Sequence, residues 1–408
     1  MEFQQSSLDN GLTLIAELNP AAASLAVGFF VKTGSRDETP EVAGVSHFLE
    51  HMMFKGTERR TAFDVNREFD EMGANYNAFT SEENTVYYAA VLPEFQDRAV
   101  DLLGDMLRPS LRKEDFETEK NVILEEIALY QDMPQFRVHE KLMAAFFANH
   151  PLGNAILGTA ESITALKQQD MQAYFDRRYA PANITVVAVG NLDFDRFAAK
   201  AAEMCSHWGP QDVSRQTPPP PGNIRRVVIP DEKVLREHVG MISPAPSAQD
   251  DRRYAGYLAA NIVGDSVGSR LYYALIEPAI ADEATTSYVP MDHAGAFFTF
   301  LSADGERAAD AVRIAAAEFR KFVDEGPTES ELQAAGNKIA SGATLKGELP
   351  MGRLAAVGSE WVYRGEYAPL AEEIDRLLRV TREEVLDVIR DFDLTATAML
   401  ALGPRDSL

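Results

Sequence analysis

The sequence predicts two α/β domains, each a β-sheet covered by helices, and three observations support this fold class. The chain has 408 residues, which is more than one ordinary hydrophobic core serves. A proline-rich segment, residues 209–223, divides it into halves of similar length. Segments of the two halves also share one order of helix, turn and strand. We therefore predict a domain at residues 1–208, a linker at 209–223 and a homologous domain at 224–408.

The linker reads GPQDVSRQTPPPPGN. Its four consecutive prolines exclude a helix or a central strand, because proline has a fixed φ and no amide hydrogen. Such a run favours an extended polyproline spacer between two folded parts.

The ends of the two halves support a duplicated fold. DMQAYFDRRYAPANITVVAVGNLD predicts a helix, a proline-marked turn and a β-branched strand ending at Gly190. EEVLDVIRDFDLTATAMLALGPRD has the same layout, with its strand ending at Gly403. Earlier in each half lies a helix with an acidic first turn and a corresponding asparagine, Asn121 or Asn337. We prefer duplication to the alternative, a chance resemblance between short helices.

Composition limits the function classes. The chain has 63 acidic and 39 basic residues and a net charge of −24, which disfavours nucleic acid as a partner. The excess of acids serves solubility, or attracts cationic substrates if the acids line a cavity. The polar start MEFQQSSLDNG has no signal-peptide layout, and the longest apolar run, residues 21–31, is about half a membrane span. We expect a cytoplasmic protein with no membrane segment.

The cysteine count restricts the choice of metal ligands. A single cysteine, Cys205, allows no intrachain disulfide and excludes a cysteine-rich zinc site. Any metal must therefore bind to histidines and carboxylates.

The segment VSHFLEHMMFKG carries the first candidate site. Gly44 precedes it and Gly56 ends it, which predicts a short helix. His47 and His51 are four residues apart, so both imidazoles lie on one face of that helix, and Glu50 lies on the same side. Zinc requires such imidazole nitrogens and, for hydrolysis, a nearby carboxylate that accepts a proton. The alternative is a pair of histidines on an amphipathic helix with an exposed glutamate.

The predicted helix at residues 114–131 supplies a third ligand. At 100° per residue, its apolar side chains form one stripe, and Glu119 and Glu126 fall in the middle of it. Glu117 and Glu125 point away. Carboxylates facing a core are costly unless a cation compensates them, so we predict Glu126 as a metal ligand with Glu119 close by. The alternative is a curved helix whose two inward glutamates meet basic side chains.

These motifs resemble a known family. HFLEH has the inverzincin spacing, and Glu126 lies 75 positions beyond His51. With GVSHFLEHMMFKGT, GANYNAFTSEENTVYYAAVLPE and EKNVILEEIALYQD, the chain strongly resembles the pitrilysin (insulinase) family of zinc metallopeptidases. Within it, the chain is most similar to the mitochondrial processing peptidase and its bacterial relatives. The resemblance implies an α/β (α+β) fold of two homologous domains, each a mostly antiparallel sheet packed with helices, forming half of a clamshell chamber.

The resemblance also implies a catalytic centre. His47, His51 and Glu126 would bind one zinc ion per chain, Glu50 would be the general base for zinc-bound water, and Glu119 matches a second acidic position beside the metal. The implied activity is that of a zinc endopeptidase acting on unfolded or short peptides, and the net charge of −24 suggests basic ones among them.

The implied substrate-binding residues lie in both halves. In the family, the strand within NAFTSEENTVYY pairs with extended peptides, which maps here to Asn77, Ala78, Phe79 and Thr80. Tyr288 matches a substrate-binding tyrosine of the second domain.

The second half departs from the family pattern. The arginine expected seven positions before Tyr288 is replaced by Ala281. The counterparts of Glu119 and Glu126 are Ala335 and Gly342, so we expect no zinc in that domain. Because the family chamber contains four such domains, the resemblance implies a dimer. We place a heterodimer with a zinc-free homologous subunit, which would supply the arginine and tyrosine, slightly ahead of a homodimer.

The sequence also allows two rival functions. The first is a non-catalytic scaffold of the same fold, similar to the core subunits of a respiratory complex. The second is a peptide-binding protein with a structural metal. The intact HFLEH motif together with Glu126 argues against the scaffold, because an inactive scaffold does not need all four residues. Glu50 argues against the structural metal, because a closed structural site needs no general base beside it.

Overall fold

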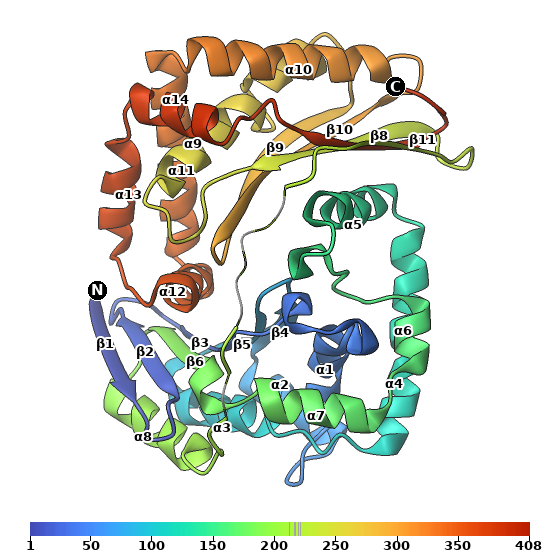
Figure 1. Cartoon of the computed structure of the whole chain (residues 1–408). Coiled ribbons are helices and arrows are strands. Elements are labelled where there is room, and N and C mark those ends of the chain that lie inside the picture. Colours follow the sequence, from blue (N-terminus) through green and yellow to red (C-terminus); the bar gives the residue numbers. More distant parts are fainter. Residues whose placement is uncertain (212, 216–217, 219, 221) are drawn as a thin grey trace. The chain divides into compact units, whose positions relative to one another are not determined.

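A computed structural model describes residues 1–211, 213–215, 218, 220 and 222–408 (Figure 1). They form two compact units, each assembled from three segments. The first unit comprises Met1–Ala128, Asn154–Gln216 and Thr344–Pro369, and the second comprises Leu129–Gly153, Thr217–Ala343 and Leu370–Leu408. The predicted linker at 209–223 includes residues 212, 216, 217, 219 and 221, so the polyproline spacer falls partly outside the described residues.

The first unit contains a six-stranded sheet and the helices around it. Its strands are β1 (Glu2–Ser7), β2 (Thr13–Leu18), β3 (Leu25–Val31), β4 (Asn75–Thr80), β5 (Thr85–Val91) and β6 (Ile184–Gly190). Its longer helices are α1 (Val45–Met53), α2 (Ala62–Met72), α3 (Gln96–Met106), α4 (Lys113–Gln131, whose last turn enters the second unit), α6 (Ala160–Ala165), α7 (Gln168–Arg178), α8 (Phe194–Cys205) and α12 (Pro350–Arg364). Its 3₁₀ turns are η1 (Ser35–Asp37), η2 (Pro40–Val42), η3 (Pro93–Phe95) and η5 (Pro181–Asn183).

The first sheet has the strand order β1-β2-β6-β3-β5-β4, and only β2 and β6 pair in parallel. Strand β3 reads LAVGFFV and is buried along its whole length, as expected of a central strand covered on both faces. On one face, Ala26 and Phe30 pack with Leu354 and Val357 of α12. Because side chains alternate along a strand, the intervening residues of β3 point to the other face, which α3 and α1 cover.

The second unit contains a five-stranded sheet. Its strands are β7 (Arg226–Pro230), β8 (Arg236–Pro244), β9 (Glu283–Met291), β10 (Ala294–Asp304) and β11 (Ala398–Gly403). Its helices are α5 (Pro134–Phe147), η4 (Pro151–Gly153), α9 (Arg253–Gly264), the π-helical η6 (Tyr272–Ile276), α10 (Ala308–Glu325), α11 (Glu329–Gly347, which extends past Ala343 into the first unit's segment), α13 (Leu370–Leu378) and α14 (Arg382–Asp391).

The second sheet has the order β7-β11-β8-β10-β9 and is likewise antiparallel except for one pair, β7 with β11. Strand β11 shows how both faces are buried. Leu400 and Leu402 pack in the core that includes Val138 and Leu142 of α5, whereas Met399 and Ala401 pack in the core that includes the helix residue Val388. Helix α5 therefore covers one face of this sheet, and α9, α10 and α14 lie on the other (Figure 1).

The prediction of a two-domain α/β fold with mostly antiparallel sheets is confirmed. The predicted strands end at Gly190 and Gly403, as β6 and β11 do, and the helix predicted at residues 114–131 is α4, Lys113–Gln131. The order β2-β6-β3-β5-β4 in the first unit corresponds to β7-β11-β8-β10-β9 in the second. This correspondence supports the interpretation of a duplicated fold.

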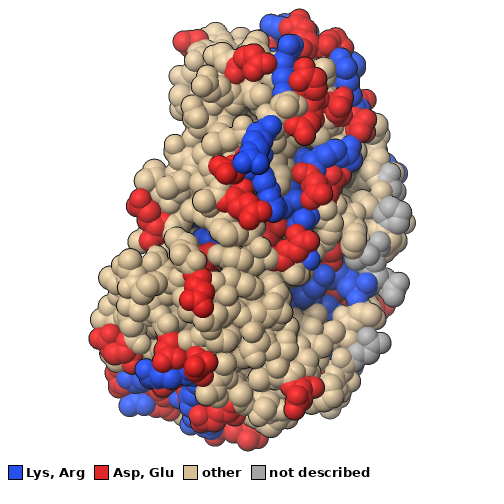
Figure 2. All heavy atoms as spheres, turned by 90° about the vertical axis from the view of Figure 1, so that its left-hand side faces the viewer, with Lys and Arg blue, Asp and Glu red and all other residues tan. Residues whose placement is uncertain are grey.

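The surface carries charges of both signs. On the face drawn in Figure 2, acidic and basic side chains lie interspersed and do not form one large area of a single sign. Among the described helices, none combines the length and apolar character needed to span a membrane.

Candidate metal centre

Helix α1 begins at a tight turn that requires glycine. Gly44, its N-terminal cap, has φ +90°, and a Cβ there would lie 2.5 Å from the carbonyl oxygen of Leu157, so only glycine fits. The carboxylate of Glu38 accepts the backbone N–H groups of Gly44 at 2.7 Å and Ser46 at 2.8 Å. Burial raises the pKa of Glu38 to about 8, although these bonds, which satisfy amides that the helix leaves free, act to lower it. The helix ends at Met53, and the predicted stop, Gly56, follows three residues later with φ +99°.

Helix α4 packs directly against α1. The rings of Phe48 on α1 and Phe116 on α4 stack, with centroids 4.7 Å apart and an interplanar angle of 11°. Both rings are fully buried, so this contact fixes the two helices against each other. As the periodicity of α4 indicates, Glu119 is buried and Glu126 half-buried, whereas Glu125 is exposed.

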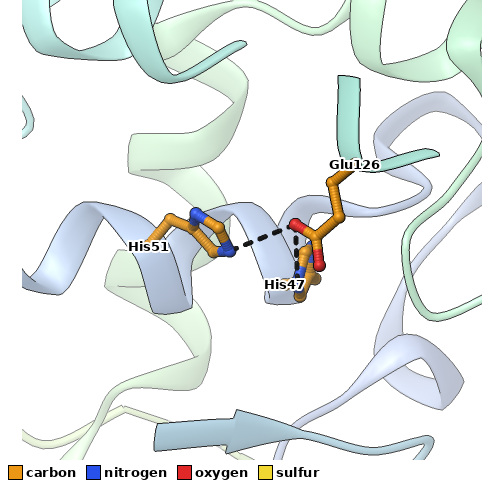
Figure 3. A group of neighbouring side chains, drawn as sticks. All are labelled: His47, His51 and Glu126. Atoms are coloured by element: carbon orange, nitrogen blue, oxygen red, sulfur yellow. Dashed lines mark ion pairs between the residues drawn. The ribbon is translucent and has the colours of Figure 1, made fainter. Parts of the chain in front are cut away.

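The structure brings His47, His51 and Glu126 together (Figure 3). The Nε2 atom of His47 lies 3.7 Å from Oε2 of Glu126, and the Nε2 atom of His51 lies 3.5 Å from the same oxygen. The two imidazole rings have centroids 4.7 Å apart. One donor atom from each side chain lies within 4.8 Å of the other two. Among the described residues, no other trio of His, Cys, Asp or Glu comes this close.

These separations fit a zinc ion. Both exceed hydrogen-bond length, at 3.7 and 3.5 Å, so the groups converge without bonding to one another. Ligands at about 2 Å in tetrahedral geometry lie roughly 3.3 Å apart, close to the separations seen. Two imidazoles and one carboxylate are the donor set of a hydrolytic zinc site with one position left for water. The residues present therefore suit zinc with little movement.

Protonation states favour metal binding at His47. Burial, reinforced by the neighbouring charge of His51, lowers the pKa of His47 to about 3, so its ring is neutral near pH 7. Burial also lowers the pKa of His51, but the hydrogen bond to Glu119 and the charge of Glu126 outweigh it, and the pKa of His51 is raised. Burial raises the pKa of Glu126, although His51 opposes this. A metal binding at His51 would therefore compete with a proton on a ring whose pKa is raised.

Glu119 supports His51 from behind. Its Oε1 atom lies 2.8 Å from Nδ1 of His51, and its Oε2 atom lies 2.5 Å from Nζ of Lys55. Burial raises the pKa of Glu119, but the hydrogen bonds from His51 and Lys55 prevail and lower it. An ionised Glu119 accepts the Nδ1 proton of His51 and leaves Nε2 for a metal. This is the usual arrangement of an outer carboxylate behind a ligating histidine.

Glu50 lies on α1 beside this group. Its Oε2 atom accepts a hydrogen bond of 2.7 Å from Oγ1 of Thr80 on β4. Burial raises the pKa of Glu50, the Thr80 bond and the charge of His51 lower it, and Glu126 raises it. The net shift is upward, which suits a carboxylate that must take up and release a proton near neutral pH.

Strand β4 borders the site and is the edge of its sheet, paired among the described strands only with β5. The turn that joins the two strands is closed by a bond from the N–H of Ser81 to the carbonyl of Asn84, at 2.8 Å. Pairing in an antiparallel ladder alternates, so Thr80, Ala78 and Tyr76 point their backbone N–H and C=O groups to the free edge. This edge can accept another extended chain.

The other predicted substrate-binding residues of β4 differ in exposure. Phe79 is 46% exposed and Asn77 is also exposed, whereas Ala78 is buried. The Oδ1 atom of Asn77 accepts the N–H of Ala78 at 2.9 Å. A peptide pairing with this edge must therefore displace the Asn77 side chain from that amide.

Tyr288 and Ala281 belong to the second unit. Tyr288 lies on β9, is 7% exposed, and donates its hydroxyl to the carbonyl of Pro246 at 2.8 Å. Ala281 is buried just before that strand. On α11, Ala335 is buried and Gly342 is exposed, and neither offers a metal ligand. The role of Tyr288 in binding substrate stays a prediction.

Sequence reasoning missed three contributors. The hydroxyl of Thr80 reaches Glu50, Lys55 neutralises Glu119, and Glu38 caps α1. Lys55 lies four residues after His51, so it continues the same face of α1 beyond the end of the helix. This spacing is the one sequence signal that could have indicated the contact of Lys55 with Glu119. The contacts of Thr80 and Glu38 depend on tertiary packing and leave no periodic trace.

Comparisons with known proteins agree with this geometry. Residues 13–160 match the domain described as insulinase (peptidase family M16), and residues 165–339 match the peptidase M16 inactive domain. A Mycobacterium bovis protein named as an uncharacterized zinc protease is 32% identical over 99% of this chain and 94% of its own length. Proteins with the same description from Rickettsia felis and Bacillus subtilis are each 29% identical, over 99% and 100% of this chain and 98% and 99% of their own lengths.

Solved structures share the fold. A protease from Helicobacter pylori superposes with a TM-score of 0.91 at 18% identity, covering 99% of both chains. A Pseudomonas fluorescens structure described as a peptidase M16 inactive domain gives a TM-score of 0.90 at 18% identity, covering 100% of this chain and 99% of that one.

Proposed function

Because this chain belongs to the insulinase family of peptidases (family M16), we propose that it is a zinc-dependent endopeptidase that hydrolyses unfolded or short peptides. The observation that carries the proposal is the convergence of His47, His51 and Glu126, with donor atoms within 4.8 Å, beside the carboxylate of Glu50. A metal held for structure alone needs no general base beside it.

The side chains divide the work of hydrolysis. When bound at these three ligands, zinc supplies a Lewis acid for the peptide carbonyl and makes water nucleophilic near neutral pH. Glu50 receives the proton of the attacking water at its carboxylate and passes it to the leaving amine nitrogen. Glu119 fixes the ring of His51 through Nδ1, so that the ligating nitrogen keeps its direction.

Strand β4 supplies the proposed substrate-binding edge. Its outward N–H and C=O groups at Tyr76, Ala78 and Thr80 pair with the backbone of an extended peptide, which is recognition with little dependence on side chains. Such pairing requires an extended segment whose backbone groups are unpaired, so unfolded or short peptides are the substrates that fit. The net charge of −24 favours basic peptides among them.

The proposal includes a dimer with a zinc-free homologous subunit, together forming a closed chamber. Two observations support a partner that completes the site. Ala281 replaces the arginine that the family resemblance leads us to expect, and the hydroxyl of Tyr288 is already bonded to Pro246 within its own unit. A fully active homodimer would contradict this part of the proposal.

The deciding experiment measures cleavage of a quenched, extended basic peptide by the zinc-loaded chain, alone and with candidate partner subunits, for the natural protein and Glu50→Gln. We expect Glu50→Gln to retain zinc and to lose turnover by at least about 100-fold, the usual contribution of a general base. Full turnover in this variant would refute the proposed function. Zinc binding without turnover in the natural chain alone, restored by a homologous subunit, would support the heterodimer.

A further inference from the structure

Thr80 connects the substrate-binding edge to the proposed general base. It is the last residue of β4, and its backbone N–H and C=O point to the free edge of the sheet. Its side chain points toward Glu50, and its Oγ1 atom donates a hydrogen bond to Oε2 of Glu50 at 2.7 Å. One residue thus contacts the peptide path with its backbone and the proton acceptor with its hydroxyl.

The neighbouring residue Thr85 determines which acceptor receives the hydroxyl proton of Thr80. Thr85, opposite Thr80 in the ladder, donates its own hydroxyl to the carbonyl of Thr33 at 2.9 Å. Its Oγ1 atom lies 3.4 Å from that of Thr80 and can act there only as a weak acceptor. The proton of Thr80 therefore goes to the carboxylate of Glu50, the shorter and charged acceptor.

The turn behind Thr80 is held by buried groups. Glu83, which is 2% exposed, pairs with Arg36 at 2.5 Å and accepts the hydroxyl of Tyr363 at 3.0 Å. Arg215 donates to the backbone carbonyl of Glu83 at 2.7 Å. These contacts come from three separate segments of the chain, so the end of β4 cannot shift without breaking buried charged bonds. Thr80 is consequently a rigid donor.

We propose that the hydroxyl of Thr80 is a positioning group that orients the carboxylate of Glu50 for proton transfer. The bond to Oε2 holds one carboxylate oxygen and leaves Oε1 to take the proton, since among the described residues no hydrogen bond reaches Oε1. This inference rests on the proposed peptidase function. In this proposal the side chain of Thr80 contributes to the catalytic step, whereas its backbone binds the peptide.

The test compares Thr80→Val, which keeps the shape and loses the hydroxyl, with Thr80→Ser, which keeps the hydroxyl. Thr85→Val is the matched control, because it removes a buried hydroxyl from the same ladder position without touching Glu50. The values of kcat and KM are measured for peptide cleavage by the active form of the protein, which is either the chain alone or the chain with its partner subunit. We expect Thr80→Val to lower kcat about tenfold, the worth of one hydrogen bond to a charged group, with KM and zinc content unchanged. Thr80→Ser and Thr85→Val should keep kcat within about twofold.

Several outcomes would overturn the inference. One is a change of KM alone in Thr80→Val, which would assign the side chain to substrate binding. Another is an equal loss of kcat in Thr85→Val, which would show a structural effect. A crystal structure of zinc-loaded Thr80→Val with the Glu50 carboxylate unmoved would also overturn it, and this measurement needs no turnover. If Glu50→Gln alone were fully active, the proposed function itself would fail, a result distinct from these.

Discussion

The Nδ1 atom of His51 lies 2.8 Å from Oε1 of Glu119, so one side of this ring is already bonded within the protein and only Nε2 faces Glu126. His47 differs, because its Nδ1 atom is buried and has no hydrogen-bond partner among the described residues. The two histidines of one helix are therefore unequal as candidate metal ligands. The orientation of His51 is set by a carboxylate, and that of His47 by packing alone.

Replacing Glu126 should abolish tight zinc binding, whereas replacing its neighbour should not. Glu126→Gln removes the only anionic ligand of the trio, so we expect a loss of zinc affinity of more than about 100-fold. Glu125→Gln, on the exposed face of the same helix, is the matched control and should bind zinc normally. Competition with a chelator of known zinc affinity measures both. Equal affinities in the two variants would remove Glu126 from the site.

Zinc affinity should weaken in acid because of His51. Its pKa is raised by Glu119 and Glu126, and a protonated ring cannot bind the metal. Affinity should therefore be constant above that raised pKa and fall by up to about tenfold per pH unit below it. His47, with a pKa of about 3, adds no proton competition near neutral pH.

Glu119→Gln provides the control for this pH dependence. It removes the charge that raises the pKa of His51, so the decline of affinity should begin at a lower pH than in the natural protein. At high pH the variant should bind zinc about 10-fold more weakly, because His51 loses its supporting carboxylate. Calorimetric titrations across pH measure both effects, and an unchanged onset of decline would contradict the role of Glu119.

Removing Arg353 should destabilise the first unit strongly. Its side chain donates to the carboxylate of Glu17 through Nε at 3.0 and 2.9 Å, and Glu17 is 1% exposed. Arg353→Met leaves a buried charge whose remaining hydrogen bond, among the described residues, comes from the hydroxyl of Tyr367, and we expect a cost of about 3 kcal/mol in the free energy of unfolding. Arg379→Met, which breaks an exposed ion pair, should cost less than about 0.5 kcal/mol. Denaturant titration would contradict this if the two variants were equally stable.

Two helical glycines should respond in opposite directions to alanine. A Cβ at Gly358 on α12 would lie 2.2 Å from the ring of Phe30, so Gly358→Ala should destabilise the protein by about 1–3 kcal/mol. A Cβ at Gly342 on α11 would meet nothing within 4 Å, so Gly342→Ala should stabilise it by about 0.5–1 kcal/mol. Thermal unfolding of both variants measures the difference, and a stabilising Gly358→Ala would contradict the close packing of α12.

The features that local periodicity encodes could be predicted from the sequence. The spacing of His47 and His51 and the position of Glu126 in the stripe of α4 follow from helix geometry, and the strands ending at Gly190 and Gly403 follow from their composition. The bonds of Thr80 to Glu50 and of Lys55 to Glu119 join separate elements, so no periodic pattern in the chain reveals them.

The sequence pattern also could not predict which chain segments belong to each of the two units. Apolar stripes on Pro134–Phe147 and Pro350–Arg364 indicate that these helices cover a sheet, but not which sheet. A division at residues 209–223 follows chain order, whereas the compact units take segments from both sides of it.

The exchange of α5 and α12 between the two halves makes the halves depend on each other. Helix α5 from the first half packs on the second sheet, and α12 from the second half packs on the first. A polypeptide of half this length would leave one face of its sheet bare, unless a copy of itself lent the missing helix in return. Each half of the chain therefore needs a helix from the other half to complete its core, and separating the halves would expose one face of both sheets.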